Sequence, residues 1–316
     1  MRDILTSTFW IAVLSSAVRL ATPILAAALG EIYTQRAGIM NLGLEGTMLM
    51  GALGGFLGCY FTGSLFLGIL FGILIGVLMS LIMGFLSITV RGNQVIAGTA
   101  LTILGSGAAV FIYRSVFGLQ KLPPQVENFQ ALNIPVLSDI PFIGPILFQH
   151  NLMVYVIYLL VPVTWFILEK TILGLRIKAV GEHPRAVESK GLSVYGLRYI
   201  AILIGGAYAG LAGAYLSIAY MNSFTENIVS GRGYIALAVV IFSHWTPTLA
   251  MGGALLFGFV NALQIRLQAI GAPIPNQFLL MLPYIITIIV LVGVSKKAEF
   301  PAAYTIPYSK NERESR

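Results

Sequence analysis

Polar side chains that could contact a solute gather in a few short stretches of an otherwise apolar sequence. In the stretch 31–46, glycines interrupt the apolar residues, and Asn41 and Glu45 lie four residues apart, so they share one helix face. An acidic group at the entrance of an apolar span is costly unless it faces a polar cavity or a partner. We therefore expect a broken helix that borders a solute path, with both side chains facing inward. An ordinary surface loop with a solvated Glu45 is the alternative.

A second group of amides and hydroxyls opens the apolar run that ends near residue 117. These groups could supply hydrogen bonds to a polar solute, although threonine in a helix more commonly bonds its own backbone. The candidates are Asn93, Gln94, Thr99 and Thr102. A further polar stretch, 220–232, contains Asn222, Glu226 and Asn227 and could form a docking or gating surface on the outer side.

Patterns typical of catalysis are absent from the sequence. Three scattered histidines and a single cysteine give no metal-ligand spacing. There is no phosphate-binding lysine loop and no nucleophile-elbow motif. Coupling to protons or sodium is poorly supported, because the sequence points to Glu45 as the only acidic candidate well placed in a span. We therefore expect no enzyme activity, no cofactor and no energy source within this chain.

One long polar segment, 169–198, interrupts the apolar regions and holds six basic and three acidic residues. The helix breakers Gly181 and Pro184 precede a short charged helix at 185–190, which ends at Gly191. A polar helix of that length is marginal alone in water. The segment is therefore expected to dock on another surface.

The composition requires lipid as the solvent, with 57% hydrophobic and 10% charged residues and a mean hydropathy of +0.87. A bilayer-spanning helix needs about 20 mostly apolar residues. Arg19 lies in the first candidate span, where its charge should be near an interface or face protein. We expect an all-α bundle of about 8–10 spans, with candidates at 7–30, 37–61, 64–89, 94–117, 151–168, 199–220, 232–245, 248–267 and 278–295.

Loop charges predict the orientation of this bundle. The connection 118–150 carries one lysine against two acidic residues, whereas the segment 169–198 and the tail are basic. Basic loops remain in the cytoplasm, so 118–150 is expected outside and the other two inside. Alternation puts the N-terminus outside, unless residues 7–22 lie along the interface. The net charge of +7 is thus a topology signal and does not indicate nucleic-acid binding.

Glycines at helical spacing in 51–58, 68–76 and 205–213 predict close packing of helices within the membrane. We expect a transmembrane domain over 1–295, which includes both polar loops, and a cytoplasmic tail over 296–316.

Several motifs resemble those of one transporter superfamily. Residues 36–51, RAGIMNLGLEGTMLMG, are similar to the RxGxxNxGxEGxMxxGA stretch of ABC importer permeases for branched-chain amino acids and simple sugars. More narrowly, they resemble permeases that work with basic-membrane-protein-type lipoproteins in nucleoside uptake. Further matches are RAVGENPxAAxxxG at 176–191, GxxAGxAGA at 205–213, GxGYxAIAVAxxG at 231–241 and the family's ending at 301–308.

This resemblance implies an inner-membrane pore subunit. Such a subunit pairs with a second, related permease, two cytoplasmic ATPase subunits and an extracytoplasmic solute-binding lipoprotein. The match also implies that an ATPase-coupling helix is formed by Gly181, Glu182, Pro184, Ala186 and Gly191. The chain departs from the pattern at His183 and Thr102, where the family usually or often has asparagine.

Nucleosides are the solute that the narrower resemblance favours. A sugar or branched-chain amino acid permease is the first alternative, because the same architecture carries those solutes. An ATP-independent secondary transporter or channel is the alternative of another class, and a membrane-embedded enzyme is the least supported.

Overall fold

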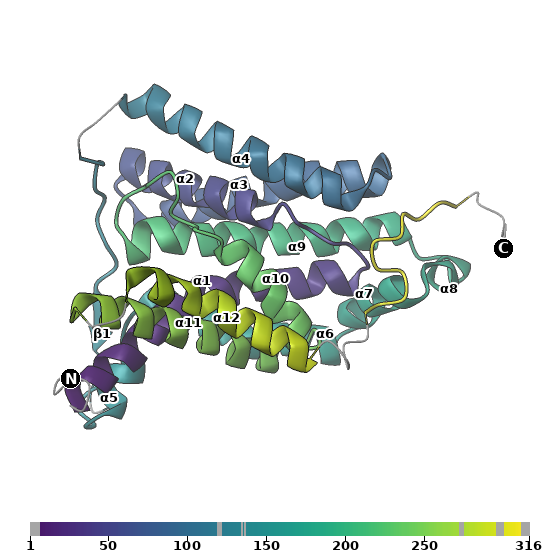
Figure 1. Cartoon of the computed structure of the whole chain (residues 1–316). Coiled ribbons are helices and arrows are strands. Elements are labelled where there is room, and N and C mark those ends of the chain that lie inside the picture. Colours follow the sequence, from purple (N-terminus) through teal and green to yellow (C-terminus); the bar gives the residue numbers. More distant parts are fainter. Residues whose placement is uncertain are drawn as a thin grey trace.

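The computed structural model describes residues 7–118, 122–133, 135, 137–271, 275–294 and 300–310. Its long helices lie side by side in one elongated bundle (Figure 1). They are α1 (Ser7–Arg36), α2 (Leu44–Thr62), α3 (Leu65–Gly84), α4 (Gln94–Phe117), α6 (Leu152–Lys170), α9 (Val194–Ala214), α10 (Arg232–Phe242), α11 (Pro247–Ala269) and α12 (Asn276–Val294). Two of them continue as π-helical turns, α3 into η2 (Phe85–Thr89) and α9 into η3 (Tyr215–Tyr220).

Short elements cap the two ends of the bundle. At one end lie α7 (Ile172–Glu182) and α8 (Pro184–Ser189), together with the described part of the C-terminal tail. At the opposite end lie α5 (Ile143–Leu147) and an antiparallel pair formed by β1 (Ala131–Asn133) and β2 (Gln149–Asn151) (Figure 1). The two polar loops are therefore at opposite ends, and the basic loop shares its end with the tail, as the charge pattern predicts.

The predicted all-α membrane bundle is confirmed. Within the described ranges, six helices are long and apolar enough to cross a bilayer, namely α1, α3 with η2, α4, α6, α9 with η3, and α11. Each of the nine candidate spans corresponds to a helix. Two candidates need correction: residues 37–43 are not helical, and α10 has 11 residues, about 16 Å, roughly half of the hydrocarbon thickness.

Helix α1 forms the centre of the bundle. It runs without a break for 30 residues, and every residue from Leu20 to Gln35 is buried. It packs on α6, α9, α10 and α11. Residues 7–22 form no separate helix but the first half of this continuous one.

Glycines let α2, α3 and α9 approach closely, as the sequence predicts. A Cβ placed on Gly76 would lie 2.3 Å from the carbonyl oxygen of Gly206, and one on Gly51 would lie 2.6 Å from Cα of Gly210. In lipid no hydrophobic force drives helices together, so this close van der Waals contact between backbones is what holds them.

Candidate functional site

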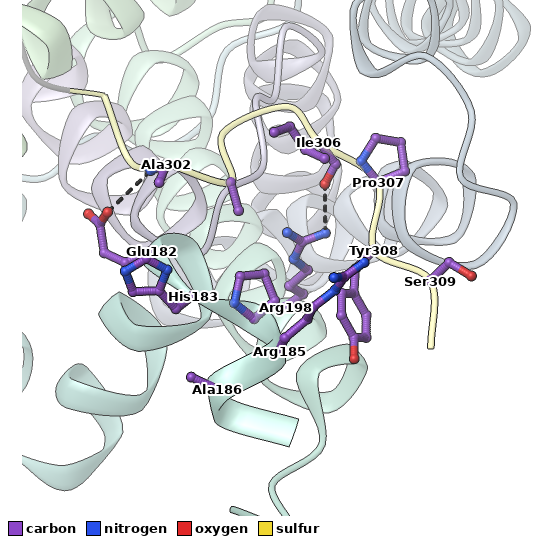
Figure 2. A pocket seen from close by; sticks show the side chains of 12 residues that line it. Glu182, His183, Arg185, Ala186, Arg198, Ala302, Ile306, Pro307, Tyr308 and Ser309 are labelled. Carbon is purple, nitrogen blue, oxygen red and sulfur yellow. Dashed lines mark hydrogen bonds between the residues drawn. The ribbon is translucent and has the colours of Figure 1, made fainter. Parts of the chain in front are cut away.

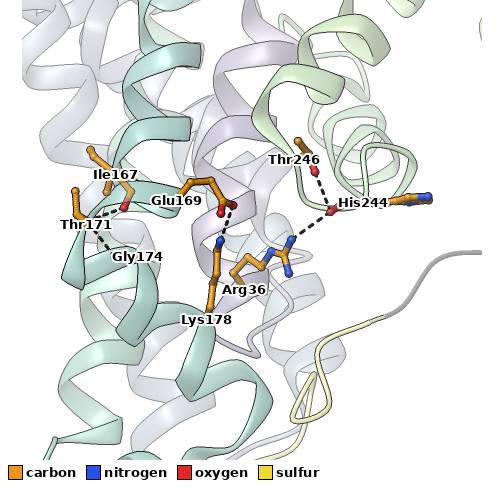
Figure 3. A network of polar contacts seen from close by, with 8 residues as sticks. All are labelled: Arg36, Ile167, Glu169, Thr171, Gly174, Lys178, His244 and Thr246. Carbon is orange, nitrogen blue, oxygen red and sulfur yellow. Dashed lines mark hydrogen bonds and ion pairs between the residues drawn. The ribbon is translucent and has the colours of Figure 1, made fainter.

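The first site is the end of the bundle that carries α7 and α8. Thr171 Oγ1 accepts a hydrogen bond from the amide of Gly174 (3.2 Å) and donates to the carbonyl of Ile167 (2.6 Å), which fixes the turn from α6 into α7 (Figure 3). Pro184 occupies the first turn of α8, where its missing amide costs nothing. Gly191 follows the helix with φ of +76°, and its amide bonds the Glu188 carbonyl at 2.8 Å. The predicted short helix therefore forms, one residue earlier than expected.

Helices α7 and α8 present an exposed apolar groove of about 400 Å³. Ile172 and Leu175 on its rim are 69% and 66% exposed. The groove is lined by Ile172, Leu175, Arg176, Ala179, Glu182, His183, Ala186, Val187, Lys190 and Leu192. An apolar hollow of this kind at a polar end of the molecule is a surface suited to another protein.

The five residues predicted to couple to an ATPase take different places around this groove. Glu182 and Ala186 line it and are exposed. Pro184 starts α8, and Gly191 ends it. Gly181 is buried beneath the groove, where a Cβ would lie 2.0 Å from the carbonyl oxygen of Arg36. The structure thus brings all five to one corner, with Ala186 and Gly191 the two exposed small residues among them.

The tail over 300–310 crosses this end as an extended strap. Its Ala303 amide donates to the carbonyl of Gly181 (2.8 Å), and its Thr305 amide donates to the carbonyl of Gly38 (3.0 Å). The strap therefore joins the end of α7 to the non-helical segment that follows α1. Sequence reasoning treated the tail as a separate segment, because these backbone bonds have no signature in the sequence.

Two side chains also bind the strap. Figure 2 shows the Glu182 carboxylate accepting from the Ala302 amide (3.2 Å) and the Arg198 guanidinium reaching the Ile306 carbonyl (3.2 Å). Arg198 is only 1% exposed, so the strap covers its charge. Between the strap and helices α7 to α9 lies a pocket of about 460 Å³.

Tyr308 ends the strap in contact with α8 and α9. Its hydroxyl donates to the Glu188 carboxylate, while the Tyr195 hydroxyl donates to its carbonyl at 3.2 Å. Burial, then the hydrogen bond that the phenol donates to Glu188, and then the negative charge of that carboxylate raise the pKa of Tyr308 to about 12. The phenol is therefore protonated and able to donate at neutral pH.

A second polar network links α7 to the centre of the bundle. Lys178 of α7 pairs with Glu169 of α6 at 2.5 Å, and Arg36 Nη2 at the end of α1 donates to the His244 carbonyl at 3.3 Å (Figure 3). The Arg36 guanidinium also lies over the Trp245 ring, 5.9 Å from its centroid. These contacts therefore tie α7 to α6, and α1 to the turn between α10 and α11.

The second site is the non-helical segment 37–43, which confirms the predicted break. The Glu31 carboxyl group accepts one hydrogen bond from the backbone amide of Asn41 and one from Gln35 Nε2, both at 3.2 Å. Gln94 Oε1 accepts from the Met40 amide at 2.8 Å. These side chains replace the missing helical hydrogen bonds, as irregular backbone at membrane depth requires.

Glu31 was missed in the sequence. It is fully buried inside α1, so the expectation that Glu45 alone is well placed in a span is wrong. The available signal was an acidic residue within the last turns of an apolar run, with Gln35 one turn later on the same face.

Glu45 holds the first turn of α10. Its two carboxylate oxygens accept from the amides of Gly231 and Gly233, each at 2.7 Å. A carboxylate at a helix N-terminus satisfies free amides and complements the helix dipole. Because the 221–231 loop runs back toward the middle of the bundle (Figure 1), this short helix starts at the depth of the α2 N-terminus.

The remaining path candidates belong to α4 and the segment beside it. Asn93 caps α4 by accepting from the Val95 and Ile96 amides, and Asn41 Oδ1 accepts from the Gly43 amide. The Thr99 hydroxyl donates to the carbonyl of Val95 in its own helix, whereas the Thr102 hydroxyl donates to the carbonyl of Leu42 in the non-helical segment 37–43. All of these side chains therefore have structural partners, and Thr99 is also exposed on the outer face of α4.

That outer face of α4 stands away from the rest of the bundle (Figure 1). It carries an open groove lined by Ser106, Gly107, Val110, Phe111, Arg114 and Ser115. Near its end, Arg114 pairs with Glu226 at 2.6 Å, which ties α4 to the 221–231 loop. The polar stretch singled out in the sequence therefore lies beside the exposed face of α4.

Comparison with known proteins agrees with this architecture. A family model described as branched-chain amino acid transport system / permease component matches residues 13–291. The guanosine ABC transporter permease protein NupQ of Bacillus subtilis is 37% identical, covering 93% of this chain and 95% of that protein. The nucleoside ABC transporter permease protein NupC of Lactococcus lactis is 34% identical, covering 92% and 95%. TsgC13 of Haloferax volcanii, a permease named for glucose, is 39% identical, covering 85% and 82%.

A solved structure supports the same fold. A metal-chelate type ABC transporter in an inward-facing conformation aligns with a TM-score of 0.52 and 15% identity, covering 89% of this chain and 85% of that chain. At this identity the likeness concerns the fold alone. The family model, by contrast, spans most of the sequence, and so do relatives more than 30% identical. This chain therefore belongs to the branched-chain amino acid transport system permease family.

Proposed function

We propose that this chain forms one half of the membrane pore of an ATP-driven importer that moves nucleosides into the cytoplasm. The observation that carries the proposal is the exposed apolar groove between α7 and α8, braced by the strap and by Arg36. The names of NupQ and NupC support nucleosides as the solute. The other subunits of the importer would be two cytoplasmic ATPase subunits, a second, paralogous permease and an extracytoplasmic solute-binding lipoprotein.

Energy would enter through the groove. An ATPase cleft that receives α8 would contact Ala186 and the exposed rim, and closure of the ATPase dimer would move α7 and α8 as one body. The strap and the Lys178–Glu169 and Arg36–His244 contacts would pass that movement to α1, α6 and α9. Packed interfaces have discrete arrangements, so a small shift can become a rigid-body opening.

The solute would pass along the exposed face of α4. This face offers hydroxyl groups and the small residue Gly107, which has open space around it. Asn41, Asn93, Gln94 and Thr102 would shape the wall of the path through the broken segment. A neutral, hydrogen-bonding solute suits such a wall, because both carboxylate oxygens of Glu45 and one of Glu31 already accept hydrogen bonds from amides.

Transport in vesicles that contain all partners tests the proposal. We expect ATP-dependent uptake of labelled guanosine, with ATP hydrolysis stimulated by the binding protein and nucleoside. Replacing Ala186→Trp should fill the groove and abolish uptake while the protein remains in the membrane. The matched variant Leu70→Trp, at an exposed position of α3 outside the groove and the strap, should leave uptake unchanged. Normal uptake by Ala186→Trp would overturn the coupling role.

A sugar importer is the second candidate, favoured by the identity to TsgC13. Competition separates the two. If labelled glucose is taken up, unlabelled glucose and not nucleoside suppresses that uptake, and glucose stimulates ATP hydrolysis, the sugar assignment replaces the nucleoside one. Uptake driven by an ion gradient without ATPase subunits would instead identify a secondary transporter.

A further inference from the structure

Two arginines at the α5 end of the bundle share a pocket that no transport step uses. The pocket has a volume of about 350 Å³ and lies between α1, the end of η3 and α11. The residues that line it include Arg19 and Arg266 but no acidic residue. The full lining is Ser16, Arg19, Leu20, Tyr220, Met221, Ala262, Ile265 and Arg266.

Neither arginine has a carboxylate partner among the residues that the structure describes. Arg19 Nη2 makes one long bond to Ser16 Oγ at 3.4 Å, and no side-chain bond of Arg266 is found in the described ranges. The backbone beneath them is held firmly, because the Tyr215 hydroxyl donates to the Arg19 carbonyl at 3.0 Å. Two cationic side chains therefore line one hollow without a carboxylate partner among the described residues, and such an arrangement favours an anion.

The neighbouring residues add no negative charge. His150 is buried beside this region, and its Nε2 lies 2.7 Å from the Ile146 carbonyl. Burial lowers the pKa of His150, and the positive charge of Arg19 lowers it further. The imidazole is thus neutral at physiological pH, so it neither adds a third positive charge beside the arginines nor offsets theirs.

The surroundings of the pocket indicate a lipid as the source of the anion. On α1, Trp10 and Leu14 lie farther out than Arg19 and are 41% and 38% exposed. A rise of 1.5 Å per residue puts Trp10 about 13 Å beyond Arg19 along the helix. Exposed tryptophan marks the membrane interface. Arg19 lies deeper than Trp10, but side chains on a helix point toward its N-terminus, so the long Arg19 side chain extends outward toward the headgroups. Exposed Ile265 on the rim is likewise suited to an acyl chain.

We propose that Arg19 and Arg266, with the hydroxyls of Ser16 and Tyr220, bind the phosphate group of an anionic phospholipid from the outer leaflet. The guanidinium groups supply paired N–H donors to the phosphate oxygens, and the apolar rim holds the first part of the acyl chain. This site also explains an arginine within the first apolar span. It does not depend on which solute the protein carries.

Lipid binding to the full-length protein, purified with its co-purifying subunits, tests the proposal. The protein is placed in nanodiscs of phosphatidylcholine with graded fractions of phosphatidylglycerol, and retained lipids are counted by native mass spectrometry. We expect saturable retention of phosphatidylglycerol by the unmodified protein. The double variant Arg19→Gln/Arg266→Gln should bind it about tenfold more weakly, as expected when charge-assisted bonds worth about 1.4 kcal/mol are lost.

Matched variants keep this test decisive. Arg114→Gln removes an arginine near the same end but outside the pocket, and it should bind like the unmodified protein. The double lysine variant keeps both charges and should retain most of the binding, which separates loss of the site from misfolding. Equal retention of phosphatidylglycerol by the unmodified and double-glutamine proteins would overturn the proposal.

Two further arms identify the source of the phosphate. In phosphatidylcholine discs, inorganic phosphate that raises the thermal midpoint of the unmodified protein, and not that of the double-glutamine variant, would support the anion site with free phosphate as its occupant. If neither phosphate nor phosphatidylglycerol binds, and the double variant loses only docking of the solute-binding protein, the pocket is a protein contact and the lipid assignment fails.

Discussion

The strap is the part of the molecule where one substitution should separate coupling from folding. Thr305 has φ of +61°, and its amide donates to the Gly38 carbonyl at 3.0 Å. Proline at this position has no amide hydrogen and requires φ near −65°. The variant Thr305→Pro therefore cannot adopt the docked backbone, while the transmembrane helices keep every contact of their own.

The size of the effect follows from two contributions. The lost hydrogen bond contributes about 1 kcal/mol, and the incompatible backbone adds about 1–3 kcal/mol. The sum, about 2–4 kcal/mol, raises the fraction of undocked strap about 30- to 1,000-fold. Uptake should fall while binding-protein-stimulated ATP hydrolysis continues, because α7 would move without pulling on the Gly38 segment.

Hydrogen exchange at the Ala303 amide reports docking directly, since that amide bonds the Gly181 carbonyl at 2.8 Å. Exchange there should accelerate in Thr305→Pro by the same factor. The matched variant Thr305→Gly keeps the amide and suits a positive φ, so its exchange should be equal or slower. If Ala303 exchange and uptake in Thr305→Pro are both unchanged, the strap does not brace the coupling end.

Three other predictions test single features of the fold. Glu45→Ala leaves the Gly231 and Gly233 amides without an acceptor and should lower the free energy of unfolding by about 2–4 kcal/mol. Glu45→Gln should lower it by about half as much. Thermal unfolding in detergent measures both. Gly76→Leu should prevent close packing of α3 on α9 and abolish folded protein in size-exclusion profiles, whereas Gly107→Leu, in open space, should fold. The pKa of Tyr308 is raised from 10 to about 12, so the contribution of its phenol to docking of the strap is complete below pH 10 and is lost as the pH rises toward 12. Hydrogen exchange at the Ala303 amide should show this loss. The variant Tyr308→Phe should remove this dependence on pH.

The long helices could be predicted because their signals are local. A run of apolar residues of sufficient length specifies a span, and glycines at helical spacing specify which faces approach. Gly181, Pro184 and Gly191 likewise set the bounds of α8 to within one residue, because breakers and caps act over a single turn.

The contacts that build the two sites could not be predicted, because their partners are far apart in sequence. Glu45 bonds residues 186 and 188 positions away, and Arg198 bonds a carbonyl 108 positions away. Asn41 and Glu45 were expected to share a face toward the path, yet Glu45 turns to α10. The tail shows the same limit, since its bonds are made by backbone groups that every residue carries.

The distance in sequence between Glu45 and its partners has a consequence for biosynthesis. Ribosomes add about 5–20 residues per second, so the 186 residues between Glu45 and Gly231 take about 10–40 s to make. Throughout that interval the Glu45 carboxyl group of α2 lacks its native donors, the amides of Gly231 and Gly233. Helix α10, at half a span, is too short to be recognised as a membrane segment alone. Insertion of α10 therefore relies on helices already assembled, and α10 docks on Glu45 during synthesis of the last third of the chain, before α11 and α12 are made.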